Sequence, residues 1–278
     1  MITRFAPSPT GLLHLGHAYA AKVAAHLADE ADGRFLIRIE DIDHTRSRPE
    51  FETAIFEDLA WLGFSWEEPV MRQSDQKRHY QSALDKLIAK ELVYPCFCTR
   101  KEIEAEVAAM PSAPHDPMGV HYPGTCRQLS EQRISEKITQ GREPAWRLNM
   151  SKAAESLGNL TAIDRKHGTI KVVPTELDDI VLARRDIGTS YHLAVVIDDA
   201  EQGISLVTRG EDLLSATPYH RVLQALLDLP VPEWFHHALI TDEQGKRLAT
   251  RDQAHSLRLY RENGLSAADV LAMLPEPT

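Results

Sequence analysis

The sequence predicts an α/β protein built on a Rossmann-like parallel sheet, and three observations support this prediction. An apolar run at residues 2–6, a turn with two prolines and a glycine, and an alanine-rich segment at 18–31 precede a second apolar run at 35–41. This order is typical of the strand, turn, helix and strand of a βαβ unit. The β-branched run at 195–197 is typical of a central parallel strand. A length of 278 residues suits one large domain with an insertion.

The rest of the chain continues this α/β pattern. Apolar residues at helical spacing, bounded by glycine and proline, predict helices at 49–62, 74–93, 100–110, 130–141, 216–228, 257–263 and 266–274. Further strands are predicted at 144–148, 170–173, 189–199, 204–213 (running into a loop) and 234–240. The expected inner face of helix 74–93 consists of Tyr80, Leu84, Leu87 and Ile88.

The composition is that of an ordinary globular protein, with 43% hydrophobic and 26% charged residues. No apolar run reaches the length of a membrane span, and the first residues read as a strand rather than as a signal peptide. Three cysteines, an odd and small number, argue against a disulfide framework and favour a reducing compartment. We therefore expect a cytoplasmic monomer with no membrane partner.

The charge balance limits the kind of nucleic-acid contact that is possible. There are 31 basic and 41 acidic side chains, a net charge of −10. This charge is unfavourable for binding nucleic acid by bulk electrostatics, so such a partner requires a local basic patch. The candidate segments are 127–147 and 246–261. The alternative for both is ordinary solvated helix surface.

The turn after the first predicted strand carries the strongest functional signal. His14 and His17 flank Gly16 where the first helix begins. A helix start attracts phosphate, and two imidazoles there can donate hydrogen bonds to phosphate oxygens in a transition state. The alternative is a helix cap with two surface histidines. A P-loop is excluded because His17 and Ala18 stand where lysine and serine or threonine are required. The absence of G-x-G-x-x-G here argues against a dinucleotide site.

The three cysteines suggest a zinc site. Cys96 and Cys98 form a C-x-C pair, and Cys126 follows after a long proline-rich loop. Thiolates in a reducing compartment suit Zn²⁺, and a tetrahedral structural site needs a fourth ligand. By chemistry alone the fourth ligand is His121 or His115. The alternative is three unlinked buried thiols.

Residues 4–17 read R-F-A-P-S-P-T-G-x-x-H-x-G-H, which resembles the signature of class I aminoacyl-tRNA synthetases of the glutamyl type. The resemblance continues at 37–41, 191–199 and 204–213. It implies that His14 and His17 are catalytic and that they bind ATP together with Gly16. Glutamyl-type relatives with a compact zinc module carry C-x-C…Y-x-x-x-C. The resemblance therefore implies Tyr122 as the fourth zinc ligand, with His121 in reserve.

An acidic amino acid needs an arginine for its carboxylate and an acidic or hydroxyl acceptor for its ammonium. The resemblance places glutamate among Arg4, Phe5, Ala6, Pro7, Ser8, Glu40, Tyr191 and Arg209. It implies that Arg4 and Arg209 bind the substrate carboxylates and that Glu40 binds the ammonium. Tyr191 then forms a wall of the pocket and a hydrogen-bond partner.

The second signature of class I synthetases, K-[ML]-S-K-[SR], departs from its pattern here. In residues 245–251, Ala249 replaces the serine and Thr250 replaces the second lysine, which in the family meets the ATP phosphates. The need at this position is for charge, so Lys246, Arg247 or Arg251 can substitute as catalytic cations. We therefore expect slow but real activation, with Mg²⁺ bound alongside ATP.

The resemblance implies four segments. Residues 1–95 and 189–255 form the two halves of the Rossmann fold, the second with the degenerate KMSKS-like loop. Residues 96–188 form an insertion, with the zinc module at 96–126 and a subdomain like the acceptor-arm-binding one. Residues 256–278 form a C-terminal helical remnant.

Full glutamyl- and glutaminyl-tRNA synthetases continue into an anticodon-binding domain, which is not expected here because the sequence ends at Thr278. The resemblance is thus to stand-alone members of the family. It implies ATP-dependent activation of L-glutamate without tRNA, then transfer to queuosine at the wobble position of tRNA(Asp). The alternatives are a ligase with a different acceptor and a catalytically weakened binding paralogue.

Overall fold

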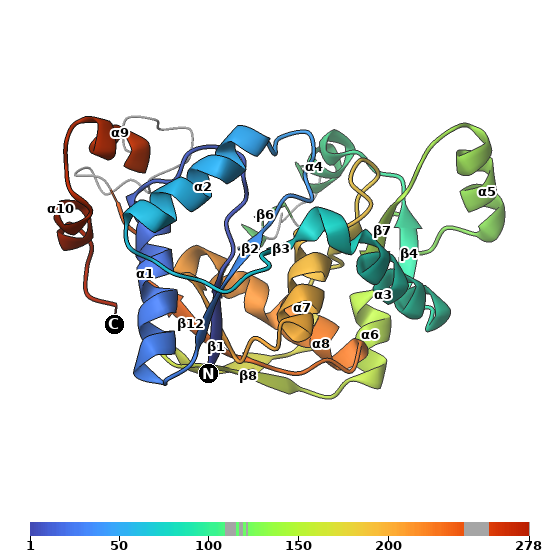
Figure 1. The fold of residues 1–278 in the computed structure, drawn as a ribbon. Helices are drawn as coiled ribbons and strands as arrows, with labels where there is room; N and C mark the ends of the chain where they lie inside the picture. The colour runs from blue at the N-terminus through green and yellow to red at the C-terminus, as the bar shows by residue number, and fades with distance from the viewer. Residues whose placement is uncertain (109–114, 117–118, 121, 242–255, 278) are drawn as a thin grey trace.

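The computed structural model describes residues 1–108, 115–116, 119–120, 122–241 and 256–277 (Figure 1). The opening βαβ unit is confirmed. Strand β1 (Ile2–Phe5), helix α1 (Leu15–Glu30) and strand β2 (Arg34–Ile39) follow one another, and β1 and β2 pair in parallel. Helix α2 (Pro49–Trp61) and strand β3 (Met71–Arg72) complete a three-stranded sheet in the order β1-β2-β3. Helix α1 packs on β1 and β2 through an alanine-rich face.

The second half of the fold is a four-stranded sheet in the order β11-β12-β8-β9. Its strands are β8 (Leu160–Asp164), β9 (Gly168–Val172), β11 (Leu206–Gly210) and β12 (Glu233–His237). The two sheets meet where β1 lies beside β11, since the Ser205 N–H donates to the Ile2 carbonyl at 3.0 Å. The predicted α/β fold with a parallel sheet is therefore confirmed.

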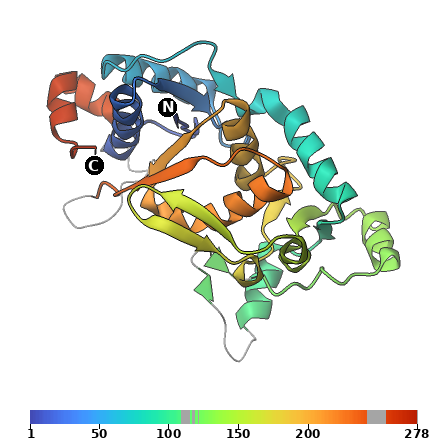
Figure 2. The ribbon, with the colours of Figure 1, turned by 90° about the horizontal axis from the view of Figure 1, so that it is seen from below.

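Strand β8 was not expected from the sequence. It pairs in parallel with β12 through Trp234 and Asp164, and it forms an antiparallel hairpin with β9. Figure 2 shows this yellow-green hairpin beside the orange β12. The middle of the chain thus supplies two strands to the sheet of the second half. The division of the chain into segments at residues 95, 188 and 255 stays a prediction.

The strand predicted at 189–199 is wrong, because these residues lie in helix α7 (Tyr191–Glu201). Ser190 caps the helix by accepting a hydrogen bond from the Leu193 N–H at 3.4 Å. Four successive residues of the helix are buried, Leu193, Ala194, Val195 and Val196, because α7 packs against α3, α8 and β10. A short apolar run buried on all sides cannot be assigned to a strand or a helix by periodicity alone.

A third sheet, antiparallel and in the order β10-β7-β4, carries the cysteine region. Its strands are β4 (Val93–Cys96), β7 (Ala145–Leu148) and β10 (Val181–Ala183). The helix predicted at 74–93 is shorter, because a 3₁₀ turn η1 (Gln73–Gln76) precedes α3 (Lys77–Ala89) and Val93 begins β4. Tyr80, Leu84 and Leu87 are buried as expected, but Ile88 is exposed.

The remaining elements complete the described part of the fold. They are α4 (Arg100–Ala108), β5 (His115–Asp116), β6 (Gly119–Val120), α5 (Glu131–Thr139), α6 (Met150–Ser156), η2 (Pro174–Glu176), η3 (Glu211–Ala216), α8 (Thr217–Leu226), α9 (Leu257–Glu262) and α10 (Ala267–Ala272). Helices α9 and α10 lie beside α1 and α2 (Figure 1). Within the described residues, no helix has both the length and the apolar character needed to cross a bilayer.

Candidate active site

A cavity of about 520 Å³ opens at the carboxyl ends of β1 and β2. This is the edge of a parallel sheet at which ligands bind. Six of the residues expected to bind glutamate line it, namely Phe5, Ala6, Pro7, Ser8, Glu40 and Tyr191. His17, from the start of α1, lines it as well. The cavity therefore brings together residues from three separate segments of the sequence.

The two signature histidines cap helix α1 reciprocally. The Gly16 N–H donates to Nδ1 of His14 at 3.1 Å, and the His14 N–H donates to Nδ1 of His17 at 3.2 Å. The two rings lie 3.9 Å apart between centroids. Because each Nδ1 is an acceptor, a neutral ring carries its proton on Nε2. Both signature histidines therefore act as caps of α1 through Nδ1.

Gly16 is required by the packing of His14. A Cβ atom at this position would lie 3.0 Å from Cε1 and 3.1 Å from Nδ1 of the His14 ring. Since His14 is itself only 9% exposed, its ring has little room to move away. A side chain at Gly16 would therefore disturb the cap.

Glu40 belongs to a buried network of charges behind the cavity. Arg38 donates to Oε1 of Glu40 at 3.1 Å and to Oδ1 of Asp199 at 2.7 Å. Arg4 donates to the same Asp199 oxygen at 2.9 Å and to the Thr208 carbonyl at 2.9 Å. Burial raises the pKa of Glu40, although Arg38 and Arg4 oppose this rise. Burial also favours a higher pKa for Asp199, but Arg4 and Arg38 together hold that pKa below its usual value.

Neither Arg4 nor Arg209 is among the residues that line the cavity. Arg4 is 3% exposed, and its guanidinium is engaged with Asp199 and Thr208. Arg209 is 6% exposed, and its Nη1 lies 3.4 Å from the Tyr191 hydroxyl, so it sits directly behind a wall of the cavity. Direct contact of either arginine with substrate therefore stays a prediction.

Three histidines around Arg209 were missed by the sequence analysis. Nε of Arg209 donates to Nε2 of His236 at 2.9 Å, and its Nη1 lies 3.1 Å from Nδ1 of His220. Nε2 of His220 in turn lies 3.2 Å from Nδ1 of His192. Burial, followed by the charge of Arg209, lowers the pKa of His192 and His236 to about 4 and holds the pKa of His220 well below its usual value. All three imidazoles are therefore neutral at pH 7, and Arg209 sets which nitrogen accepts.

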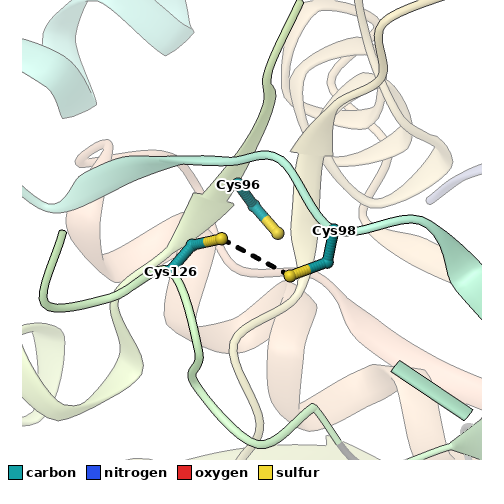
Figure 3. Close-up of side chains that lie close together, drawn as sticks. All are labelled: Cys96, Cys98 and Cys126. Atoms are coloured by element: carbon teal, nitrogen blue, oxygen red, sulfur yellow. Dashed lines mark hydrogen bonds between the residues drawn. The ribbon is translucent and has the colours of Figure 1, made fainter. Parts of the chain in front are cut away.

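The three cysteine thiols converge (Figure 3), and the Tyr122 hydroxyl lies beside them. Sγ of Cys98 and Sγ of Cys126 are 3.4 Å apart, too far for the disulfide bond length of about 2.0 Å. The Tyr122 hydroxyl lies 3.4 Å from Sγ of Cys96 and 4.0 Å from Sγ of Cys98. Ligand atoms about 3.7 Å apart are expected around a tetrahedral Zn²⁺ with Zn–S bonds of about 2.3 Å. These four donors therefore fit a structural zinc ion.

The alternative ligand His121 lies outside the described residues, as do Lys246, Arg247, Ala249, Thr250 and Arg251 of the second signature. The chain re-enters the described part at Ser256, which forms a β-bridge with His14. The Leu257 N–H donates to the Leu13 carbonyl at 2.8 Å. The segment that follows the second signature is thus fixed beside the first.

Comparison with known proteins points to one family. Residues 1–275 match the family model described as tRNA synthetases class I (E and Q), catalytic domain. The chain is 50% identical to the glutamyl-Q tRNA(Asp) synthetase of Rhodobacter capsulatus over 99% of both chains. It is 41% identical to the glutamyl-Q tRNA(Asp) synthetase of Nocardia farcinica, over 98% of this chain and 83% of that relative.

A solved structure supports the same fold. The glutamate tRNA ligase of Elizabethkingia meningosepticum, solved in complex with its amino acid, is similar with a TM-score of 0.75 and 31% identity. The similarity covers 91% of this chain and 52% of the ligase, so the chain spans about half the length of that protein.

Proposed function

Because the chain belongs to the family of class I glutamyl- and glutaminyl-tRNA synthetase catalytic domains and is therefore a ligase, we propose that it activates L-glutamate with ATP in the absence of tRNA and transfers it to queuosine in tRNA(Asp). Glutamate, ATP and a tRNA are the substrates of its family. The finer assignment, to queuosine at the wobble position, is supported by the glutamyl-Q tRNA(Asp) synthetases that the chain matches over 98–99% of its length.

One structural observation supports this proposal above the others. The cavity at the sheet edge is lined by Glu40 and Tyr191, which the family resemblance places around glutamate, and by His17 of the signature that meets ATP. An ammonium acceptor and a phosphate-binding helix start thus share one space, as adenylate formation requires.

In the first step the α-carboxylate of glutamate attacks the α-phosphate of ATP, and pyrophosphate leaves. Nε2–H of His17 and of His14 donates to phosphate oxygens as negative charge builds up on them. The start of α1 adds its free N–H groups to the same phosphate site. Mg²⁺, which usually accompanies ATP in this class, neutralises phosphate charge when bound.

Recognition of glutamate depends on the charge network behind the cavity. Glu40, held by Arg38, accepts the substrate ammonium. The positive charges of Arg4 and Arg209 attract the two carboxylates, and Arg209 orients the Tyr191 hydroxyl. In the second step a hydroxyl of the queuosine cyclopentene ring attacks the mixed anhydride and releases AMP.

Zinc has a structural role in this proposal. Cys96, Cys98, Tyr122 and Cys126 would hold the ion and so join the end of β4 to the segment that leads into α5. The site lies on the insertion rather than at the glutamate cavity, so it supports the fold and takes no part in the chemistry.

The proposal is tested in two stages. ATP–pyrophosphate exchange with glutamate, measured without tRNA, reports activation; labelled glutamate is then offered with queuosine-containing or unmodified tRNA(Asp). We expect exchange without tRNA and transfer to the queuosine-containing tRNA alone. Exchange that requires tRNA, or equal transfer to both tRNAs, would contradict the proposal.

A weakened binding paralogue is the second candidate, and the replacement of the second lysine by Thr250 favours it. Loss of one transition-state donor costs roughly 10²–10³ in rate, which leaves an enzyme that is slow but active. The variant Thr250→Lys separates the two candidates. Faster exchange in Thr250→Lys, with measurable exchange in the unmodified protein, supports the enzyme; no glutamate-dependent exchange in either protein supports the binding paralogue.

A further inference from the structure

Arg209 is a buried cation that has no counter-ion within the described residues. Its guanidinium donates to four neutral groups, which are Nε2 of His236 at 2.9 Å, Oγ1 of Thr217 at 2.8 Å, Nδ1 of His220 at 3.1 Å and the Tyr191 hydroxyl at 3.4 Å. Arg4, by contrast, pairs with the carboxylate of Asp199 at 2.9 Å. Charges buried in proteins are normally paired. Arg209 therefore lacks the partner that a buried cation requires.

The histidines that hold Arg209 are neutral because of the hydrogen bonds that they make. A guanidinium has only N–H donors, so Nδ1 of His220 and Nε2 of His236 must each be an unprotonated acceptor. The proton of His220 is therefore on Nε2, which donates to Nδ1 of His192 at 3.2 Å. Burial, followed by the charge of Arg209, also lowers the pKa of all three imidazoles. The histidine shell (His192, His220 and His236) thus fixes the guanidinium without neutralising it.

Two hydrogen-bond donors in this group have no acceptor within the described residues. A guanidinium has five N–H groups, and the neutral acceptors use four of them. The oxygen of the Tyr191 hydroxyl accepts from Nη1 of Arg209, which leaves the hydrogen of that hydroxyl for another acceptor. Tyr191 lines the glutamate cavity. A carboxylate bound at Tyr191 can therefore accept from the hydroxyl and compensate the charge of Arg209 directly behind it.

A carboxylate and a carboxamide differ by one charge at this position. The carboxylate of glutamate supplies the negative charge that Arg209 lacks, whereas the carboxamide of glutamine leaves the buried cation uncompensated. A site with a buried polar group strongly rejects an analogue that leaves this group unpaired. A carboxylate within the shell would itself pair with the guanidinium and remove this preference. The selection of glutamate therefore depends on the neutrality of the shell as well as on Arg209.

We propose that His220, oriented by His192, is a specificity-determining positioning residue, which fixes Arg209 as a neutral acceptor and leaves the counter-charge to the substrate carboxylate. The inference rests on the proposed function, since it takes the occupant of the cavity to be glutamate. It deepens that function by naming residues behind the cavity wall that distinguish glutamate from glutamine. His220 is not among the residues that line the cavity, so it acts through Arg209.

The test compares His220→Gln with His220→Glu, two variants of nearly equal size that differ by one charge. The first keeps a neutral acceptor for Nη1 of Arg209, and the second introduces a carboxylate. His79→Glu, at an exposed histidine of α3 beside Glu201, is the control for a negative charge added elsewhere. Calorimetry gives the Kd for glutamate and for glutamine, and pyrophosphate exchange gives the KM for glutamate and for ATP.

We expect His220→Glu to raise the Kd and the KM for glutamate about 100-fold, with an unchanged KM for ATP. Its preference for glutamate over glutamine, as the ratio of the two Kd values, should fall by a similar factor. His220→Gln should raise the Kd for glutamate only about threefold and keep the preference. His79→Glu should match the unmodified protein. His192→Phe, which removes the acceptor of the His220 N–H, should raise the KM for glutamate with a smaller change in kcat.

A second pair of variants covers the case in which a buried carboxylate at residue 220 prevents folding. Thr217→Asn and Thr217→Asp repeat the comparison at Nη2 of Arg209. Thr217 begins helix α8, where an acidic side chain is tolerated. Equal losses of glutamate binding in the neutral and the charged member of a pair would overturn the inference, because the shell would then have only a structural role. An unchanged preference for glutamate in folded His220→Glu would overturn it as well.

Failure of the proposed function gives a different result. If the unmodified protein binds glutamate but does not transfer it to queuosine-containing tRNA(Asp), the proposed acceptor is wrong and the inference stands. If the unmodified protein binds no glutamate, the proposed substrate is wrong and the inference is overturned with it.

Discussion

Nε of Arg209 donates to Nε2 of His236 at 2.9 Å, and this contact determines where the imidazole carries its proton. With Nε2 as acceptor, Nδ1–H must point to Oδ2 of Asp164, 2.5 Å away. The side chain of Arg209 is therefore fixed from behind by strand β12, through His236, and by strand β8, through Asp164.

Replacing His236 tests this support of Arg209. In His236→Phe the imidazole acceptor is lost, so the guanidinium is no longer held in the position from which the proposed function has it attract a glutamate carboxylate. We expect the KM for glutamate in pyrophosphate exchange to rise about tenfold, with a smaller change in kcat and an unchanged KM for ATP. Asp164→Asn should shift the same parameter in the same direction. An unchanged KM for glutamate in a folded His236→Phe variant would refute a positioning role.

The signature histidine that lines the cavity is expected to be required for activation. In His17→Ala the proposed donor to the ATP phosphates is lost, and so is the cap on the His14 N–H. We expect pyrophosphate exchange to fall to background and the free energy of unfolding to fall by about 1 kcal/mol. His26→Ala, on an exposed part of the same helix beside Glu30, is the control and should retain exchange. Exchange near the original rate in His17→Ala would count against the proposed mechanism.

Asp58, buried in helix α2, makes the protein less stable at neutral pH. Within the described residues neither carboxylate oxygen accepts a hydrogen bond, and Arg261 is 3.7 Å away. Burial raises the pKa of Asp58 to about 6. Between pH 4 and 6 the Asp58 carboxyl therefore stays protonated in the folded state. In the unfolded state its pKa is about 3.9, so over the same pH range it has already lost the proton. Stability from this group is highest below pH 4 and falls as the pH rises to about 6.

It follows that Asp58→Asn should raise the free energy of unfolding at pH 7.5 by about 2 kcal/mol, and by much less at pH 4.5. Urea unfolding at the two pH values measures this difference. Glu57→Gln, at the exposed neighbour that also faces Arg261, is the control and should change stability by less than about 0.5 kcal/mol. A gain for Asp58→Asn that does not depend on pH would show that the carboxylate charge is not the cause.

The cysteine cluster predicts one zinc ion per chain. Cys126→Ser should lose zinc and lower the melting temperature, and a strong chelator should do the same to the unmodified protein. Tyr122→Phe identifies the fourth ligand, because it keeps the ring against Arg147 but removes the hydroxyl. We expect Tyr122→Phe to bind zinc more weakly and His121→Ala to bind it unchanged, as measured by metal content after dialysis against a competing chelator. The reverse result would assign the position to His121.

The opening of the fold could be predicted from sequence because its signals are local. Prolines, Gly11 and Gly16 separate apolar runs whose lengths fit a strand and a helix, and the structure confirms β1, α1 and β2. The cysteines could be predicted as a cluster because the C-x-C spacing and a third thiol have few other uses in a reducing compartment.

Other features depend on tertiary contacts and could not be predicted in this way. Residues 195–197 have strand-like side chains but lie in α7, where packing on every side overrides propensity. Strand β8 is specified by pairing with β12, more than 65 residues further along the chain. The histidines around Arg209 were missed because His192, His220 and His236 are far apart in sequence. Each of these histidines stands beside apolar residues in the sequence, and this was the signal that could have indicated that they are buried.

The bridge between Ser256 and His14 joins two parts of the chain that are about 240 residues apart in sequence. Together with the hydrogen bond from the Leu257 N–H to the Leu13 carbonyl, it fixes the start of α9 at the start of α1. A substitution that moves the start of α9 would therefore also disturb the cap of α1, so the C-terminal helices help to hold the first signature in place.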